Sequence, residues 1–419
     1  MREFLELNPP NKFWEKIKEY LINKKIKVEK LTLDDSLGRI VSEDILSPVN
    51  LPPFSRSTVD GYAVRAADTA GSSTALPTFL EVIGSVVMGK ETELEISAGE
   101  AAAVPTGGML PKGANAVLMI ENTEKIDDST IESSKSLGIG ENIVKKAEDI
   151  ARDEILFKKG HKLMARDIGA LAGLGITELR CFKKPEVSVI STGDELIPPE
   201  AKAKLGQIRD INSYTIASYL QKIGAAPKKV GIIEDNLESL KSSVKNELDK
   251  DLVLISGGSS VGIKDMTIEI LDSLGEPGVL LHGLSIKPGK PTILAIIDET
   301  IVIGLPGHPG SAWTVTTVLV SEVVKVLTGE KNIAEIGLDD EKYIIKAKLT
   351  RGVVSDKGRE EYIPVKITKN EAGELLAVPQ LGKSSLITNL VKGDAVLKIK
   401  SYQEGKEIGE TVDLKIIEN

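Results

Sequence analysis

The sequence has little cysteine and no long uninterrupted apolar run. Cys181 is the one cysteine among 419 residues, so no intrachain disulfide can form, which fits a reducing compartment. The longest apolar stretch, residues 311–327, contains Glu322 and Lys325 and is too short to cross a bilayer. The charged N-terminal stretch 1–16 lacks the apolar centre of a signal peptide. We therefore expect a soluble, cytoplasmic protein that does not enter a membrane.

An excess of positive charge is also missing, as are several common catalytic motifs. The chain has 53 Lys and Arg residues against 62 Asp and Glu, a formal net charge of −9. Nucleic-acid binders usually carry a basic face, so no nucleic-acid partner is expected. The sequence contains no GxxxxGK[ST] phosphate loop, no HExxH pair and no Ser/His/Asp order. Any anion site must therefore be built from several loops.

The segment 252–313 carries the pattern expected for such loops. Three short apolar runs each stop at a turn rich in Gly and Pro: 252–255 before Gly257-Gly258, 284–286 before Pro288-Gly289, and 301–303 before Pro306-Gly307. Short runs of this kind suit strands buried on both faces. Glycine after a strand lets backbone N–H groups approach a ligand, and a following helix N-terminus adds positive potential.

Polar side chains follow these runs and would meet at the carboxyl ends of a parallel sheet, where open α/β folds bind ligands. They are Ser259, Ser260, Asp265, His282, Lys287, Lys290 and His308. Tight turns with solvated charges are the alternative interpretation. Three such loops, two of them with lysines, favour a phosphate-type site.

Acidic residues at further loop ends suggest a magnesium site. The acidic and amide residues there are Asp194, Glu195, Asp210, Asn212, Asp235 and Asp265. One or two carboxylates together with phosphate oxygens can hold Mg²⁺. Acidic residues near strand ends are also often helix N-caps, and we favour that role for Asp210 and Asn212. Asp60-Gly61 in the sequence FSRSTVDGYAV is interpreted, on residue types alone, as a hairpin turn.

The pattern of elements predicts a multi-domain α/β plus all-β fold. Strands alternate with helices from Pro185 onward, which is typical of a three-layer α/β domain with a parallel-rich sheet. Alternating strands return after residue 340 and predict a C-terminal β-barrel or sandwich. The predicted domains are a small helical N-terminal domain (1–50 plus 145–180), an inserted β domain (51–144), the α/β domain (181–329) and the C-terminal β domain (330–419).

Five stretches, in order, resemble the signatures of MoeA-type molybdopterin molybdenumtransferases, which are related to the gephyrin E domain. They are VDGYAV at 59–64, STGDEL at 191–196, ISGGSSVGIKD at 255–265, IKPGKP at 286–291 and GLPGHP at 304–309. Three departures from the family pattern are His308 in place of Asn, SGGSSVG in place of SGGVSVG, and Ala147 in place of Gly. The resemblance covers essentially the whole chain.

The resemblance implies Mg²⁺-dependent insertion of molybdate (or tungstate) into adenylated molybdopterin, with release of AMP. The implied catalytic residues are Asp60, Thr106, Asp149, Glu195 and Asp265, of which Glu195 and Asp265 would hold Mg²⁺ or water. The expected substrate-binding residues, from the resemblance and from the loops described above, are Asp194, Asp235, Gly257, Gly258, Ser259, Ser260, Lys287, Lys290, Pro306, His308 and Pro309.

The resemblance also implies a homodimer, whose sites lie between the α/β domain of one subunit and the β domain of its partner. The protein that adenylates the pterin is an expected partner. An alternative is a homodimeric gephyrin-like scaffold that binds a peptide without catalysis, but a scaffold would not need acidic and basic loops together. An adenylyltransferase is a third alternative, although that activity resembles a smaller related domain for which the chain has no second copy.

Overall fold

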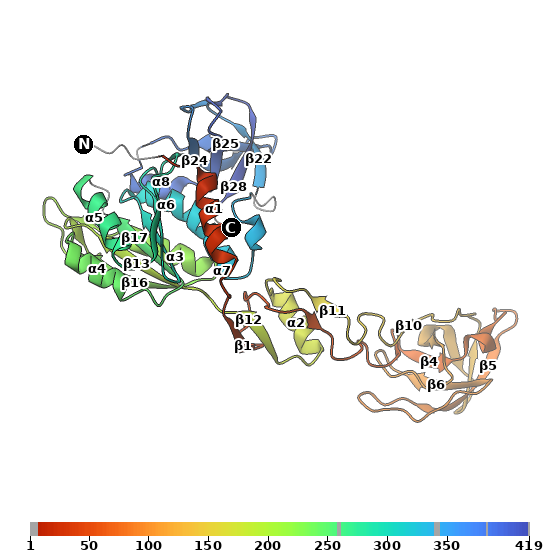
Figure 1. Ribbon diagram of the computed structural model, residues 1–419. Helices are drawn as coiled ribbons and strands as arrows, with labels where there is room; N and C mark the ends of the chain where they lie inside the picture. Colours follow the sequence, from red (N-terminus) through yellow and green to blue (C-terminus); the bar gives the residue numbers. More distant parts are fainter. Residues whose placement is uncertain (1–6, 258–260, 339–343, 383, 418–419) are drawn as a thin grey trace. The chain divides into compact units, whose positions relative to one another are not determined.

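A computed structural model describes residues 7–257, 261–338, 344–382 and 384–417 of the chain (Figure 1). The chain divides into two compact units. The first contains residues 1–29, 38–42 and 180–419, and the second contains residues 30–37 and 43–179. Each unit has its own core and is described separately below.

The first unit contains a six-stranded sheet in the order β16-β13-β17-β21-β20-β18. Its strands are β13 (Glu186–Thr192), β16 (Ala226–Ile233), β17 (Leu252–Gly257), β18 (Pro277–His282), β20 (Ile293–Ile297) and β21 (Thr300–Leu305). The first four strands in this order are parallel, whereas β20 runs antiparallel to both of its neighbours. The prediction of a parallel-rich sheet from the alternating pattern is therefore confirmed.

Helices cover both faces of this sheet (Figure 1). They are α1 (Pro10–Leu21), α3 (Asn212–Lys222), α4 (Leu237–Lys245), α5 (Val261–Asp272), α6 (Pro309–Val315) and α7 (Ser321–Leu327). Successive side chains of a strand point to opposite faces. Leu252 and Leu254 accordingly join the cluster beneath α1, α3, α6 and α7, whereas Val253 and Ile255 join the cluster beneath α4 and α5. Burial on both faces explains why the runs are apolar at every position.

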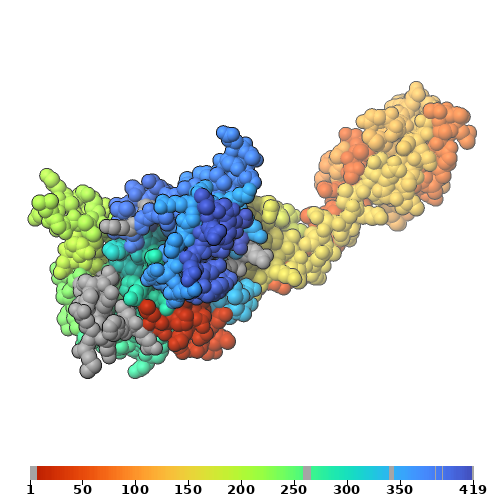
Figure 2. Space-filling model, turned by 90° about the horizontal axis from the view of Figure 1, so that it is seen from above, coloured from red at the N-terminus to blue at the C-terminus, as the bar shows by residue number. Residues whose placement is uncertain are grey.

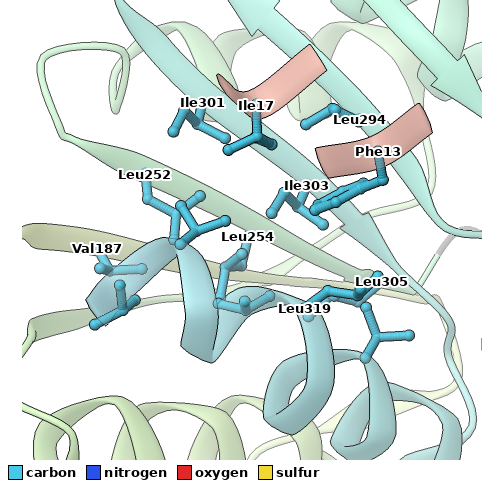
Figure 3. Close-up of a cluster of buried hydrophobic side chains, with 14 of the residues drawn as sticks. Phe13, Ile17, Val187, Leu252, Leu254, Leu294, Ile301, Ile303, Leu305 and Leu319 are labelled. Atoms are coloured by element: carbon cyan, nitrogen blue, oxygen red, sulfur yellow. The ribbon is translucent and has the colours of Figure 1, made fainter. Parts of the chain in front are cut away.

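The N-terminal helix is part of this core. Phe13 and Ile17 are fully buried and pack with Ile301, Ile303 and Leu294 (Figure 3). Burial of an apolar side chain of this size contributes about 1.5–3 kcal/mol. The buried residues of α1, which are Phe13, Ile17 and Leu21, recur at helical spacing, as expected for an amphipathic helix.

The segment 309–327 is one continuous helical run, with a π-helical segment η3 (Thr316–Val320) between α6 and α7. The helix is longer than the apolar stretch 311–327, so the expectation that it is too short to cross a membrane is wrong by length and composition alone. However, 78% of its most apolar window is buried inside the protein. Its buried hydroxyls are satisfied locally, since Thr316 and Ser321 donate to the carbonyls of Ala312 and Thr317 at 2.8 and 2.7 Å. The run is a central core helix.

Glu322 on α7 is buried among three lysines, Lys325, Lys331 and Lys415. Burial alone would raise the pKa of this carboxyl, but the ammoniums of Lys415, Lys325 and Lys331 outweigh burial and lower the pKa to about 2. A depressed folded-state pKa stabilises the fold above the unfolded-state pKa, near 4.3, and this stabilisation is lost as the pH falls towards 2.

We expect Glu322→Gln to lower the free energy of unfolding by about 3 kcal/mol at pH 7, because three ammoniums lose a buried partner. The difference from wild type should shrink between about pH 5 and pH 2, where the wild-type carboxylate takes up its proton. Urea unfolding across this pH range measures the effect. Glu335→Gln, which changes an exposed carboxylate, is the matched control; equal losses at all pH values in the Glu322 variant would contradict the ion-pair account.

The C-terminal part of the first unit is a closed barrel of five strands. They are β22 (Ile344–Leu349), β24 (Glu360–Lys369), β25 (Leu375–Pro379), β26 (Ala395–Ile399) and β28 (Thr411–Ile416), in the order β24-β25-β22-β28-β26 with β26 pairing back to β24. Strand β19 (Ile286–Lys287) of the α/β segment pairs in parallel with β24, and Figure 2 shows the blue barrel against the α/β residues. The helix α8 (Ile387–Lys392) lies between β25 and β26 in the chain. The predicted barrel is confirmed.

The second unit contains a six-stranded sheet in the order β7-β4-β6-β5-β9-β8. Its strands are β4 (Gly61–Val64), β5 (Thr78–Ser85), β6 (Glu100–Val104), β7 (Ala116–Met119), β8 (Thr123–Lys125) and β9 (Thr130–Ser133). The same unit holds the helix α2 (Ala165–Gly173) and the short pairs β2–β11 (Ile45–Leu46 with Ile155–Phe157) and β3–β10 (Arg56–Ser57 with Ile143–Val144). The inserted all-β character expected from the sequence is confirmed.

Two local predictions in this unit are wrong. The sequence pattern predicts a short strand at residues 93–96, but no strand forms there, and Glu95 makes only an isolated bridge, to Lys112. Asp60-Gly61 is not a hairpin turn, because Gly61 begins β4, which lies between β6 and β7. A Cβ atom at Gly61 would lie 1.8 Å from the carbonyl oxygen of Leu118. The glycine is therefore explained by close packing of neighbouring strands rather than by turn geometry.

Candidate functional site

A cavity of about 940 Å³ lies at the carboxyl ends of β13, β16, β17 and β21. Its walls come from the loops that follow these strands, from the β14–β15 pair (Leu196–Ile197 with Ile208–Arg209), from the start of α3 and from the C-terminal segment 385–387. The carboxyl ends of parallel strands are the usual ligand-binding edge of an open α/β sheet. The volume suits a ligand of the size of a cofactor.

Glycine is required where two of these strands end side by side. Gly257 has a φ of +125°, and a Cβ atom there would lie 1.9 Å from the carbonyl oxygen of Thr192. A Cβ atom at Gly193 would lie 2.9 Å from a carboxylate oxygen of Glu195. Both glycines line the cavity, so the backbone itself forms part of the wall. This agrees with the sequence argument that glycine after a strand exposes backbone to a ligand.

The acidic side of the cavity is held by hydrogen bonds. Thr192 Oγ1 donates to Asp235 Oδ1, and the backbone N–H of Asp235 donates to Asp194 Oδ1 at 3.0 Å. Asp235 and Glu195 line the cavity, and Glu195 is exposed. Asp194 therefore fixes the loop that presents Asp235. One expected substrate-binding carboxylate is preorganised in this way, while Glu195 is accessible from solvent.

Asp210 and Asn212 connect the loops around the cavity. Asp210 accepts hydrogen bonds from the Ser213 N–H, in the first turn of α3, at 3.1 Å and from the Ser191 hydroxyl at 2.8 Å. The N-cap residue of α3 is Ile211, however, and Asn212 is the first residue of the helix, so the N-cap role expected for Asp210 and Asn212 is wrong. Asn212 Nδ2 instead donates to Ser256 Oγ at 2.8 Å and to the Gly307 carbonyl at 2.9 Å. Asn212 therefore joins the end of β17 to the loop after β21, a role that sequence reasoning did not predict.

His308 and Pro309 bring the GLPGHP stretch into the cavity wall. His308 is exposed and precedes α6, and its carbonyl accepts the N–H groups of Ser311 and Ala312 at 3.0 and 2.9 Å. Pro309 occupies the first helical position, where a missing N–H has no cost. Pro306 is buried beside this turn and does not line the cavity.

The two motif lysines do not line this cavity. Lys287 Nζ forms an ion pair with Glu361 Oε1 at 2.8 Å, and both residues line a separate cavity of about 240 Å³. Lys290 is exposed. The sequence pattern predicts both lysines in the anion site at the carboxyl ends of the sheet, whereas the structure places Lys287 in a separate cavity, beside Glu361 of β24.

Several expected site residues lie elsewhere. Gly258, Ser259 and Ser260 lie outside the described residues, and α5 carries Asp265, whose side chain also lies outside the description. The second unit contains Asp60, Thr106 and Asp149. There, Asp60 Oδ1 accepts the backbone N–H of Thr106 at 2.8 Å, and Asp149 N–H donates to the Leu51 carbonyl at 3.1 Å. Asp60 and Thr106 are therefore neighbours, as a shared role requires.

The cavity also contains residues that sequence reasoning missed. Arg209, Gln207, Ser385 and Ile387 line it. The guanidinium of Arg209 donates to the carbonyls of Pro199 and Ala201 at 2.8 and 3.1 Å, which fixes the loop between β14 and β15. Arg209 directly precedes Asp210 at a predicted loop end, and this position could have indicated it as a residue of the site. Ser385 and Ile387 belong to the C-terminal segment and carry no motif that could have indicated them.

The acidic side chains of the cavity wall suit Mg²⁺ bound at an open site rather than a structural metal enclosed by protein ligands. Within residues 7–257 and the other described ranges, no group of three or more His, Cys, Asp or Glu side chains is arranged to hold a metal. Mg²⁺ is commonly bound through one or two carboxylates together with water and substrate phosphates. Glu195 in the cavity wall fits that kind of open site as one such carboxylate.

The sheet and its cavity define an α/β ligand-binding domain, and residues 188–326 match the family model described as "Probable molybdopterin binding domain". Residues 11–175 match the MoeA N-terminal region (domain I and II), and residues 346–417 match the MoeA C-terminal region (domain IV). The chain belongs to the MoeA family of molybdopterin molybdenumtransferases, which are transferases of molybdenum cofactor biosynthesis.

Curated relatives and a solved structure are similar to this chain along nearly its full length. A molybdopterin biosynthesis protein of Methanocaldococcus jannaschii is 33% identical over 414 residues, 96% of each chain. A molybdopterin molybdenumtransferase of Haemophilus influenzae is 32% identical over 390 residues, 92% of this chain and 93% of that one. The crystal structure of a molybdopterin biosynthesis MoeA protein from Pyrococcus horikosii has a TM-score of 0.85 at 37% identity, and the match covers 99% of this chain and 100% of that one.

Proposed function

We propose that the chain inserts molybdate, or tungstate, into adenylated molybdopterin and releases AMP. The observation that carries the proposal is the cavity of about 940 Å³, which is lined mainly by the segment that matches the molybdopterin-binding family model. We further propose a homodimer with the four domains predicted from the sequence, whose shared sites include Asp60, Thr106 and Asp149 of one subunit. The pterin-adenylating protein would supply the substrate.

The cavity walls meet the chemical needs of such a ligand. Adenylated molybdopterin carries two phosphates and a dithiolene, and the incoming oxyanion adds further negative charge. The backbone at Gly257 and the start of the helical run at Pro309 favour anions. Mg²⁺ bound by Glu195 and Asp265 would neutralise phosphate charge that these carboxylates otherwise repel.

The protein's own groups have distinct proposed roles. Asp235, fixed by Thr192 and Asp194, orients the substrate. The exposed Glu195, or Asp265, holds the water that attacks the phosphoanhydride, since a carboxylate can orient water by accepting its hydrogen bond. Asn212 keeps the end of β17 and the loop after β21 at a fixed separation.

A single-turnover assay tests the proposal. Purified protein is mixed with adenylated molybdopterin and Mg²⁺, with and without molybdate, and AMP and molybdenum cofactor are measured. We expect AMP release and cofactor formation to depend on molybdate and to stop when EDTA removes Mg²⁺. Binding of the pterin without AMP release under any of these conditions would contradict the enzyme and support the scaffold alternative.

A further inference from the structure

The ion pair between Lys287 and Glu361 is incompletely satisfied. Glu361 lies on β24 of the barrel and is 8% exposed. Its Oε1 lies 2.8 Å from Lys287 Nζ, whereas its Oε2 is buried and has no hydrogen-bond partner among the described residues. Leaving a buried carboxylate oxygen unpaired is costly, so such atoms in folded proteins call for a functional explanation.

A structural ion pair in the same unit offers a comparison. Both oxygens of Glu322 are paired, with Lys325 and Lys415 on Oε1 and Lys331 on Oε2. Glu361 has one lysine, and that lysine has a side chain 44% exposed. Each carboxylate oxygen of Glu322 thus has a lysine partner, whereas one oxygen of Glu361 has no partner among the described residues.

The pair faces a cavity rather than a packed interior. Lys287 and Glu361 both line the cavity of about 240 Å³, together with Trp313 and Thr314 of the central helical run. A backbone hydrogen bond from Gly310 N–H to the Ser384 carbonyl at 2.8 Å links two segments that contribute to the walls of both cavities. Gly310 and Ser384 line the small cavity, and their chain neighbours Pro309 and Ser385 line the large one.

The backbone fixes the two charged groups opposite each other. Strand β19 pairs in parallel with β24, and Lys287 is registered with Glu361. An ammonium has three N–H donors, so contact with one carboxylate oxygen leaves capacity for an anion. Any anion that reaches Lys287 must share it with the fixed negative charge of Glu361, which lowers the gain from binding.

We propose that Glu361 sets the strength of oxyanion binding: its carboxylate competes with oxyanions for the Lys287 ammonium in the small cavity and so keeps their binding weak and reversible. The inference rests on the proposed function and on the expectation, drawn from the family resemblance, that Lys287 binds substrate. It adds a residue of the C-terminal barrel that sets how strongly an oxyanion is held before transfer.

Equilibrium binding of molybdate and of sulfate to the full-length protein, measured by calorimetry, tests the proposal without turnover. Glu361→Gln keeps the size of the side chain and removes its charge, so molybdate should bind at least about threefold more tightly. Glu361→Asp keeps the charge and should bind molybdate as wild type does. Lys287→Gln combined with Glu361→Gln should abolish the gain.

The neighbouring residue provides a matched control. Glu360 lies next along β24, where successive side chains point to opposite faces, and it accepts a hydrogen bond from the Tyr362 hydroxyl at 2.6 Å. Glu360→Gln should leave molybdate binding unchanged. An unchanged or weaker affinity in a folded Glu361→Gln protein, or no measurable molybdate binding in any variant, would overturn the inference. The proposed function is judged separately, by AMP release.

Discussion

Glu195→Gln and Asp265→Asn should each lower turnover at least about 100-fold while the fold is retained, because each removes a charge from a metal-assisted step. Glu195 is exposed in the wall of the large cavity, so its carboxylate has no packing role whose loss would unfold the protein. The measurement is single-turnover AMP release at saturating Mg²⁺ and molybdate, with the unfolding midpoint recorded for each variant.

Glu234→Gln is the matched control for these variants. Glu234 immediately precedes Asp235 and is exposed, but it does not line the cavity. The same change of charge at the same edge of the sheet should therefore leave turnover near normal. Near-normal turnover in both the Glu195 and the Asp265 variants would contradict the assignment of the metal and water site.

Mixed dimers of two inactive variants should recover about a quarter of wild-type activity. Asp60 and Glu195 belong to different compact units of the chain, and the family resemblance implies sites shared between subunits. When Asp60→Ala and Glu195→Ala chains are unfolded together and refolded in equal amounts, about half of the dimers are mixed. In a shared-site dimer, one site of each mixed pair carries both substitutions and the other carries neither.

The control is each variant refolded alone, which should remain inactive. Mass spectrometry of the intact dimers establishes that mixed pairs have formed. If each site lay within a single chain, every site would keep one substitution and no activity would return. Absence of recovery in verified mixed dimers would thus reject the shared-site model.

Much of the fold could be predicted because its elements are specified by local patterns. The run 252–255 is apolar at every position because both faces are buried, and the alternating strands expected after residue 340 include the barrel strands β26 and β28. The glycine loops correctly indicated the edge of the sheet where the cavity lies. These features depend on periodicity and turn chemistry, which a sequence states directly.

The remaining features depend on contacts between segments far apart in the chain. The IKPGKP motif predicts Lys287 in the anion site, but the ion pair of Lys287 with Glu361 follows from the pairing of β19 with the barrel strand β24. Asp-Gly at 60–61 has the composition of a turn, yet Gly61 is required by the proximity of Leu118. Ser385 enters the cavity wall from the C-terminal segment. No local pattern encodes these three relations.

The most direct test of the account is a crystal structure of the protein with adenylated molybdopterin and Mg²⁺ bound to an inactive Glu195→Gln variant. The account predicts that the pterin phosphate lies in the large cavity, between the backbone at Gly257 and the side chain of Asp235. A ligand bound with full occupancy anywhere outside this cavity, with the cavity itself filled by water, would contradict the central claim.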